Sequence, residues 1–236
     1  MRGSLLTLVV LAALVLLVVP YFVLPPVLEN LVARNVQDRL GLAERPGVEL
    51  NSDPQWRMLL GEFSGGKVSV GETDLGGVRA EGVSMDLDPF SVDVAESVQS
   101  QTAVAERSVS GRVRLTVSEG EVSRLAGQNT EVPVNGVELK KGGVTVESEA
   151  SFLGATFPVT VDGGVGVEGN ALVFQPETVR AAGMTVPADL ADSLLAGTTF
   201  RYPVEDLPYG GRLTGAEARE GAVVLTGRVS GVELGG

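Results

Sequence analysis

The chain has 236 residues, with 30 acidic side chains, 18 basic side chains and a net charge of −12. It contains no cysteine and no histidine, which excludes disulfides, thiolate or imidazole metal sites, cysteine nucleophiles and a Ser-His-Asp triad. The negative charge disfavours nucleic acid as a partner, because phosphate binding needs clustered Lys and Arg, and it disfavours electrostatic attachment to anionic lipid.

The chain begins with an apolar segment of membrane-spanning length. From Leu5 to Leu24 the side chains are apolar except for Thr7 and Pro20, and about 20 apolar residues let a helix cross a bilayer core. The run ends without a small-x-small cleavage pattern, which favours an uncleaved anchor over a cleaved signal peptide. We therefore expect residues 1–28 to be a transmembrane anchor of a single-pass cell-membrane protein, with the bulk of the chain on the extracytoplasmic side.

An amphipathic helix is predicted directly after Pro25 and Pro26, which suit a first helical turn. Apolar residues recur at helical spacing from Leu28 to Leu40, and Gly41 is a suitable stop. The opposite face has mixed charge and lacks the Lys and Arg richness of helices that lie on membranes. The pattern therefore favours a helix that packs on the core of its own domain.

The rest of the chain is rich in valine and glycine and predicts short strands separated by turns. Short helices are expected at residues 118–125 and 187–195. A hairpin turn is expected at Gly163-Gly164, and a final pair of strands is expected around Gly227. The strands are expected at residues 48–50, 67–70, 83–87, 112–117, 144–147, 157–161, 165–167, 171–174, 222–225 and 228–234. The predicted fold is α+β with a mostly antiparallel sheet, and residues 29–236 are expected to form a single domain.

Three patterns that suggest chemistry fail on their context. Residues 164–169 match G-x-G-x-x-G, but alternating valines follow where a dinucleotide-binding site needs a helix. Asp86, Asp88 and Asp93 have the oxygen ligands for Ca²⁺ but not the spacing of an EF-hand. No acidic residue lies in the apolar, aromatic setting that raises a catalytic pKa. We therefore predict a protein that is not an enzyme, with no catalytic residue, no metal and no cofactor.

Large apolar side chains in turn-flanked segments are the better candidates for a site, because ligand pockets are mostly hydrophobic. The alternative is that these side chains fill the core. The candidate lipid-binding residues are Met58, Leu59, Leu60, Phe63, Phe152, Phe174, Phe200 and Tyr202.

Five segments of the chain form a recognisable series: Val48–Gly61, Lys67–Val70, Phe174–Val179, Leu207–Thr214 and Gly221–Val229. The most specific of them contains Leu-Pro-Tyr-Gly at residues 207–210. Together they resemble the LmeA-like (lipomannan elongation factor A) family of exported proteins from high-GC Gram-positive bacteria. The chain departs from the family pattern at Asp53–Arg57, where members tend to have an apolar turn. The resemblance implies phospholipid binding and a fold like the tubular lipid-binding (TULIP-like) domains, in which a strongly curved sheet wraps around a long helix.

The resulting hypothesis is a membrane-anchored envelope protein that binds phospholipid or an acyl chain in an apolar groove. Such a protein would support envelope glycolipid maturation or lipid transfer. Two alternatives remain open at this stage. One is an envelope scaffold that binds an unknown protein partner, and the other is a glycosidase that uses two carboxylates.

Overall fold

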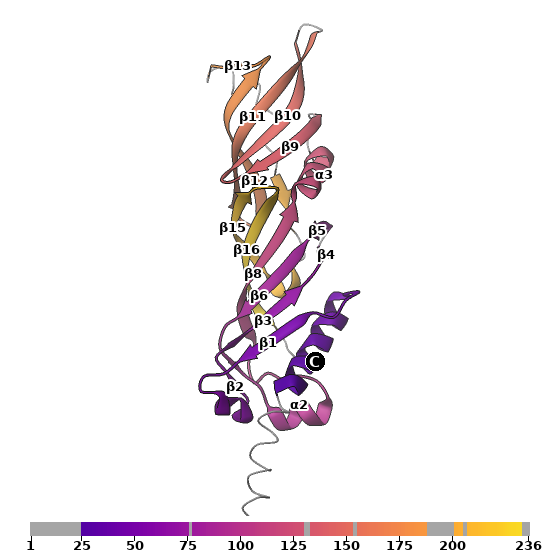
Figure 1. Cartoon of the computed structure of the whole chain (residues 1–236), viewed down its shortest axis with the longest axis vertical. Helices are drawn as coiled ribbons and strands as arrows, with labels where there is room; N and C mark the ends of the chain where they lie inside the picture. The colour runs from indigo at the N-terminus through magenta and orange to yellow at the C-terminus, as the bar shows by residue number, and fades with distance from the viewer. Residues whose placement is uncertain are drawn as a thin grey trace, which may run out of the picture. The chain divides into compact units, whose positions relative to one another are not determined.

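The computed structural model describes residues 25–75, 77–129, 133–152, 155–187, 201–204 and 207–232 (Figure 1). The predicted anchor segment Leu5–Leu24, the body of the predicted helix at 187–195 and Phe200 lie outside the described residues. Within the described ranges, none of the helices combines the length and the apolar character needed to cross a membrane.

The chain divides into two compact units. Unit 1 comprises Met1–Val70, Ser84–Arg112 and Ser230–Gly236, and unit 2 comprises Gly71–Val83 and Val113–Val229. The division falls inside three strands, β6, β8 and β16, so the expectation of one domain over residues 29–236 stays a prediction.

Helical segments lie before, between and after the strands in the first half of the chain. The first helix is described over residues 25–40. It is followed by β1 (Gly47–Asn51), the 3₁₀ helix η1 (Gln55–Leu60), β2 (Glu62–Phe63), β3 (Gly65–Val70), β4 (Thr73–Leu75), β5 (Val78–Ala80), β6 (Gly82–Leu87), β7 (Phe90–Ser91), α2 (Val94–Ser100), β8 (Val109–Ser118) and α3 (Glu119–Asn129).

The second half of the chain contains longer strands together with two short ones, β13 and β14. Its strands are β9 (Val134–Lys140), β10 (Gly143–Phe152), β11 (Ala155–Glu168), β12 (Ala171–Ala181), β13 (Met184–Thr185), β14 (Arg201–Pro203), β15 (Arg212–Arg219) and β16 (Ala222–Val232), with the 3₁₀ turn η2 (Pro208–Gly210) before β15.

The strands form two main sheets whose described pairings are antiparallel. One has the order β1-β3-β6-β8-β16-β15, and the other has the order β13-β12-β11-β10-β9 with β14 paired to β12. The predicted α+β class and the antiparallel sheet are confirmed. The strongly curved sheet around a long helix is wrong, because the sheets are neither closed nor strongly curled.

The core of unit 1 forms between the first helix and the strands. The predicted apolar face is confirmed, since Leu28, Val32 and Val36 are buried. A Glu29 Oε1 atom accepts a hydrogen bond from the Leu50 amide at 3.2 Å, which ties the helix to β1. Phe63 and Phe90, whose rings stack on each other, are also buried in unit 1.

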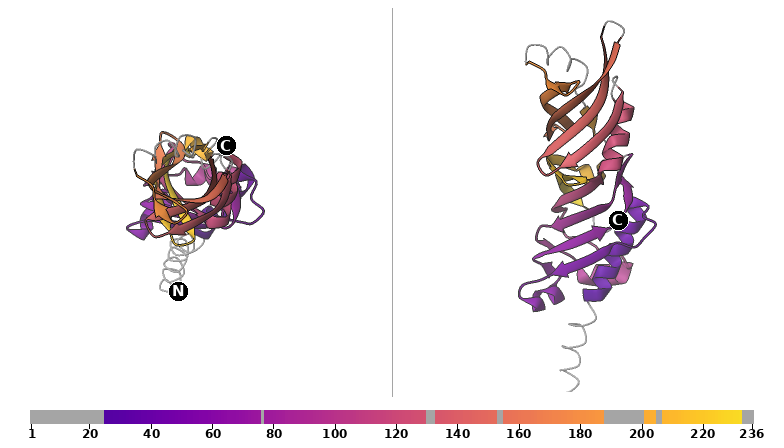
Figure 2. Two further views of the ribbon diagram at one scale, coloured as in Figure 1. Left: turned by 90° about the horizontal axis from the view of Figure 1, so that it is seen from above. Right: turned by 45° about the horizontal axis from the view of Figure 1, so that its top comes forward.

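The core of unit 2 forms where α3 lies alongside β9 and contacts β5 and β14 (Figure 2). Val122, Leu125 and Ala126 of α3 are buried there. The predicted helix at 118–125 is thereby confirmed and extends further than expected.

Two predicted turns are wrong, and both involve glycine. Gly163 and Gly164 lie inside the continuous strand β11, and Gly227 lies inside β16. A Cβ atom on Gly163 would lie 2.2 Å from the Gln175 carbonyl oxygen, and one on Gly227 would lie 2.8 Å from that of Arg212. The glycines thus permit close approach of the paired strand at irregular points of the ladder and do not reverse the chain.

Candidate functional site

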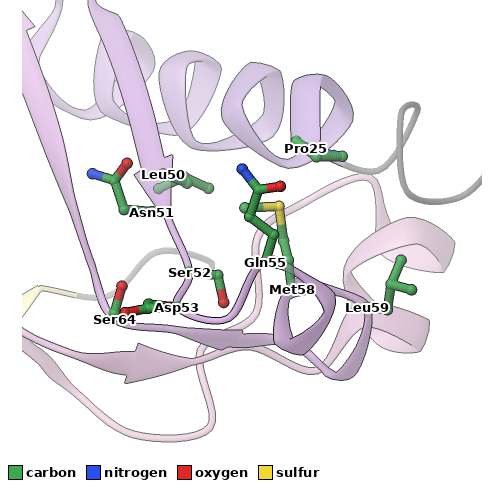
Figure 3. Close-up of a pocket in the computed structure, with 9 residues that line it drawn as sticks. All are labelled: Pro25, Leu50, Asn51, Ser52, Asp53, Gln55, Met58, Leu59 and Ser64. Carbon is green, nitrogen blue, oxygen red and sulfur yellow. The ribbon is translucent and has the colours of Figure 1, made fainter.

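One cleft of unit 1 lies between the N-terminal end of the described helix at residues 25–40 and η1, and we call it the η1 cleft (Figure 3). Its volume is about 330 Å³. Figure 3 shows Pro25 at the start of the first helix, facing the segment that carries Gln55 and Met58. The lining residues are Pro25, Leu50, Asn51, Ser52, Asp53, Gln55, Met58, Leu59 and Ser64.

The cleft is lined by an apolar and a polar set of residues, which we call its apolar and its polar wall, and the two sets adjoin at η1, where Gln55 lies beside Met58 (Figure 3). Pro25, Leu50, Met58 and Leu59 supply carbon and sulfur surface, whereas Asn51, Ser52, Asp53, Gln55 and Ser64 supply amide, hydroxyl and carboxylate groups. No Lys or Arg is among these lining residues. The arrangement suits a ligand that is itself half apolar and half polar.

Side chains on more than one side of η1 line the cleft. Because a 3₁₀ helix repeats every three residues, Gln55 and Met58 project on the same side, and both line the cleft. Leu59 also lines it, whereas Trp56 and Leu60 are exposed. The helix ends at Gly61, whose φ of 76° is in the left-handed region and whose amide donates to the Met58 carbonyl at 3.1 Å.

Gly61 also fixes η1 to the segment that leads into α2. The Val92 amide donates to the Gly61 carbonyl at 2.8 Å, and a Cβ atom on Gly61 would lie 2.0 Å from the Val92 carbonyl oxygen. Only glycine accommodates this approach. On the polar wall, Ser52 Oγ donates to the Glu62 carbonyl at 2.6 Å, and the Ser64 amide donates to the Asn51 carbonyl at 2.9 Å.

Unit 2 contains a different, entirely apolar space enclosed by α3 and the strands. Its volume is about 10 Å³, which is room for about one water molecule. An acyl chain therefore does not fit without movement of the surrounding elements. The lining residues are Val78, Val117, Val122, Leu125, Leu172, Tyr202, Val204, Val223 and Leu225.

An ion pair between the buried Glu121 and the half-exposed Arg124 holds α3 in place. Glu121, which is 7 % exposed, accepts hydrogen bonds from Arg124 Nε at 2.7 Å and from the Arg79 amide of β5 at 2.9 Å. Arg124 also donates to the Gly77 carbonyl at 2.9 Å. The hydrogen bonds from Arg124 keep the pKa of the Glu121 carboxyl below its ordinary value, although burial acts in the opposite direction.

The predicted site residues that the structure describes are divided between units 1 and 2. Met58 and Leu59 line the η1 cleft, and Leu60 lies on the same helix but is exposed. Tyr202 lines the apolar space of unit 2. Phe63 and Phe174 are buried core residues of units 1 and 2, and Phe63 stacks on Phe90 with ring centroids 5.0 Å apart. Phe152 ends β10 opposite Ala155, and Phe200 lies outside the described residues.

The polar wall and Pro25 were missing from the sequence prediction. Asn51 and Ser64 come together only through the pairing of β1 with β3, which no local pattern reveals. Of the three aspartates weighed and rejected as calcium ligands, Asp93 has a structural role, since its carboxylate caps α2 by accepting from the Glu96 amide at 2.8 Å. In the part of the chain that the structure describes, no group of three or more acidic side chains is arranged to hold a metal ion.

The chain is an α+β protein whose unit 1 carries a cleft lined by both apolar and polar side chains. A family model for LmeA-like phospholipid-binding proteins matches residues 19–228, nearly the whole chain. The chain therefore belongs to the LmeA-like phospholipid-binding family, and the resemblance drawn from the sequence is confirmed. Neither the curated proteins nor the solved structures contain a match to it.

Proposed function

We propose that the protein is a membrane-attached phospholipid-binding protein of the cell envelope, and that the η1 cleft holds the junction between the headgroup and the acyl chains of one lipid. The observation that carries the proposal is the position of Pro25. This residue follows directly on the apolar run Leu5–Leu24 and lines a cleft with one apolar and one polar wall.

The size and chemistry of the cleft support binding of part of a lipid. Ligand pockets commonly have volumes of about 300–1,000 Å³, and the η1 cleft, at about 330 Å³, is at the lower end. Each methylene buried against the apolar wall contributes about 0.8 kcal/mol. The uncharged amides and hydroxyls opposite suit the ester and glycerol region, and the Asp53 carboxylate disfavours direct contact with a phosphate.

Attachment to the membrane through residues 5–24 would make this binding efficient. A tether raises the effective concentration of lipid at the cleft without any new contact, which offsets the overall charge of −12. The attachment predicts that the full-length protein stays in the membrane fraction after a carbonate wash. A mature N-terminus mapped between residues 18 and 40 would contradict it.

We further propose that the bound lipid is presented or transferred and not chemically changed, in support of envelope glycolipid maturation. The binding activity in the family description agrees with a protein that is not an enzyme. A reproducible hydrolase or transferase turnover that one Asp→Ala or Glu→Ala change abolishes would overturn this part of the proposal.

The test is the lipid content of the full-length protein, purified in detergent and measured by mass spectrometry. We expect co-purified phospholipid, and we expect Leu59→Asn in the cleft to reduce its amount. Met184→Asn is a matched control, because Met184 is 72 % exposed and does not line the cleft. Equal lipid content in both variants, with unchanged melting temperatures, would show that the η1 cleft is not the lipid site.

A further inference from the structure

Large apolar side chains that remain exposed to water are concentrated in unit 1. Across the described ranges they are Val27 (37 % exposed), Trp56 (54 %), Leu60 (62 %), Val98 (52 %) and Met184 (72 %). Only Met184 belongs to unit 2. Single exposed apolar residues need no explanation, but several at one place indicate an interaction surface.

Three elements bring the four residues of unit 1 together, and we call this set the docking face: Val27, Trp56, Leu60 and Val98. The first turn of the first helix borders the η1 cleft through Pro25. Through Val27 it also borders a second hollow of about 410 Å³, which Val98 of α2 lines from the other side. The Gly61 carbonyl at the end of η1 accepts a hydrogen bond from the amide of Val92, which lies two residues before α2. In Figure 1, the first turn, η1 beside β2, and α2 lie together at one end of unit 1.

The side chains around the docking face are typical of a membrane interface. Tryptophan prefers the headgroup level of a bilayer, where its ring is apolar and its N–H remains near water. Arg57 lies next to it, with its guanidinium 6.0 Å from the centre of the Trp56 ring. Arg34 and Arg45 line the second hollow. Arginine side chains of this kind cover apolar surface with their stems while the charge stays in water.

We propose that the docking face rests on a phospholipid bilayer, with Trp56 at the level of the headgroups. The occupant follows from the neighbouring sequence, since the apolar run Leu5–Leu24 ends next to Pro25, which borders this face. Insertion of apolar groups is the driving force, because the chain has a net charge of −12. Docking therefore occurs on zwitterionic lipid and depends little on salt. The inference rests on the membrane attachment proposed above.

Trp56 is the sole tryptophan of the chain, so the native protein carries its own reporter. Full-length protein is placed in phosphatidylcholine vesicles whose acyl chains carry bromine, which quenches nearby tryptophan. We expect most of the Trp56 emission to be lost and acrylamide to have little access to the ring. The same result is expected at low and at high salt.

A matched control moves the reporter within unit 1. In Trp56→Phe combined with Ser69→Trp, the tryptophan is on the exposed position 69 of β3. Ser69 pairs with Gly47, whereas Asn51 at the cleft pairs with Gly65, so position 69 is about 13 Å along the strand from the cleft. We expect much weaker quenching from this position. Equal quenching at both positions would overturn the proposal.

One bound lipid must be distinguished from a bilayer. A short-chain brominated phosphatidylcholine, kept below its micelle concentration, supplies single lipids to protein in detergent. Quenching of Trp56 under this condition alone would show a cleft ligand and no docking. A water-exposed Trp56 in vesicles, in a protein that still co-purifies with lipid, would overturn docking and leave the proposed function intact. The reverse pattern, quenching without bound lipid, would retain docking and reject the cleft.

Discussion

Unit 1 keeps large apolar side chains in water around an open cleft of about 330 Å³, whereas unit 2 encloses its apolar residues around a space of about 10 Å³. Both units are built from antiparallel strands and at least one helix. The difference lies in what fixes the helical segment. In unit 1, η1 buries Met58, and the Gly61 carbonyl at its end accepts a backbone hydrogen bond from Val92. In unit 2, α3 buries Val122 and Leu125, and its ion pair includes the buried carboxylate of Glu121.

This contrast separates residues that maintain the fold from residues that are available for a ligand. Substitutions in the closed unit are expected to lower stability. Substitutions around the open cleft are expected to change binding with a smaller effect on the free energy of unfolding. The following predictions test that separation.

The largest effect is expected from Phe174→Ala in unit 2. Phe174 is 7 % exposed on β12, and truncation of a buried phenylalanine costs about 3–5 kcal/mol of stability. Chemical denaturation of full-length protein in detergent measures this loss. Unchanged stability together with lost lipid would instead make Phe174 a ligand contact, as the sequence analysis proposed.

A second prediction concerns the glycine that attaches η1. In Gly61→Ala the left-handed backbone alone costs about 1–3 kcal/mol, and the new Cβ would collide with the Val92 carbonyl oxygen. We expect lower stability of unit 1 and loss of bound lipid. Gly41→Ala is the matched control, since its φ is also positive at 61° but no atom lies within 4 Å of the added Cβ. Lipid loss in both variants would show that the effect is not specific to the cleft.

A third prediction concerns the ion pair of α3. Glu121→Ala removes the side-chain acceptor of the Arg79 amide and one of the partners of Arg124, and the loss of a buried acceptor costs about 1–3 kcal/mol. Glu138→Ala is the control, because its pair with Lys140 is exposed and such pairs contribute about 0–1 kcal/mol. Equal losses in the two variants would contradict a structural role for Glu121.

The Glu121 carboxyl also makes the stability of the folded protein depend on pH. Its pKa is lower in the folded protein than in the unfolded chain, so the unfolded chain binds the proton more readily. The stabilisation is therefore present above the ordinary glutamate pKa and is lost as the pH falls through the lower, folded value. Stability of the native protein should fall more steeply in acid than that of Glu121→Ala. Parallel pH profiles would contradict this assignment.

Local sequence patterns predicted the elements whose signal is repeated along the chain. The first helix follows from apolar residues between Leu28 and Val36, and both the spacing and the buried face are confirmed. Glycine was the main source of error. Gly163 and Gly227 look the same in sequence as a turn glycine, but each lies where a paired strand approaches closely. That distinction depends on a partner strand distant in sequence.

The candidate site shows the same limit. Met58 and Leu59 could be selected because they are apolar residues in a segment edged by glycine, and both line the η1 cleft. The polar wall could not be predicted, because Asn51 and Ser64 meet through strand pairing. Phe63 and Phe174 were selected by the same rule but are buried in the cores. Apolar character alone does not distinguish a ligand contact from a core residue.

The smallest effect on stability, and the sharpest test of the open unit, is expected from Leu60→Asn. Leu60 is 62 % exposed and does not line the cleft, so the free energy of unfolding should change by no more than about 0.5 kcal/mol. Lipid that co-purifies in detergent should also be unchanged, because that binding needs no bilayer. In brominated phosphatidylcholine vesicles, however, Trp56 should be quenched less and should become more accessible to acrylamide, since the docking face has lost one of its apolar groups. A melting temperature that falls together with the quenching would show that Leu60 stabilises η1 itself. This residue of unit 1 would then maintain the fold, as the buried residues of unit 2 do, and would not be available for docking.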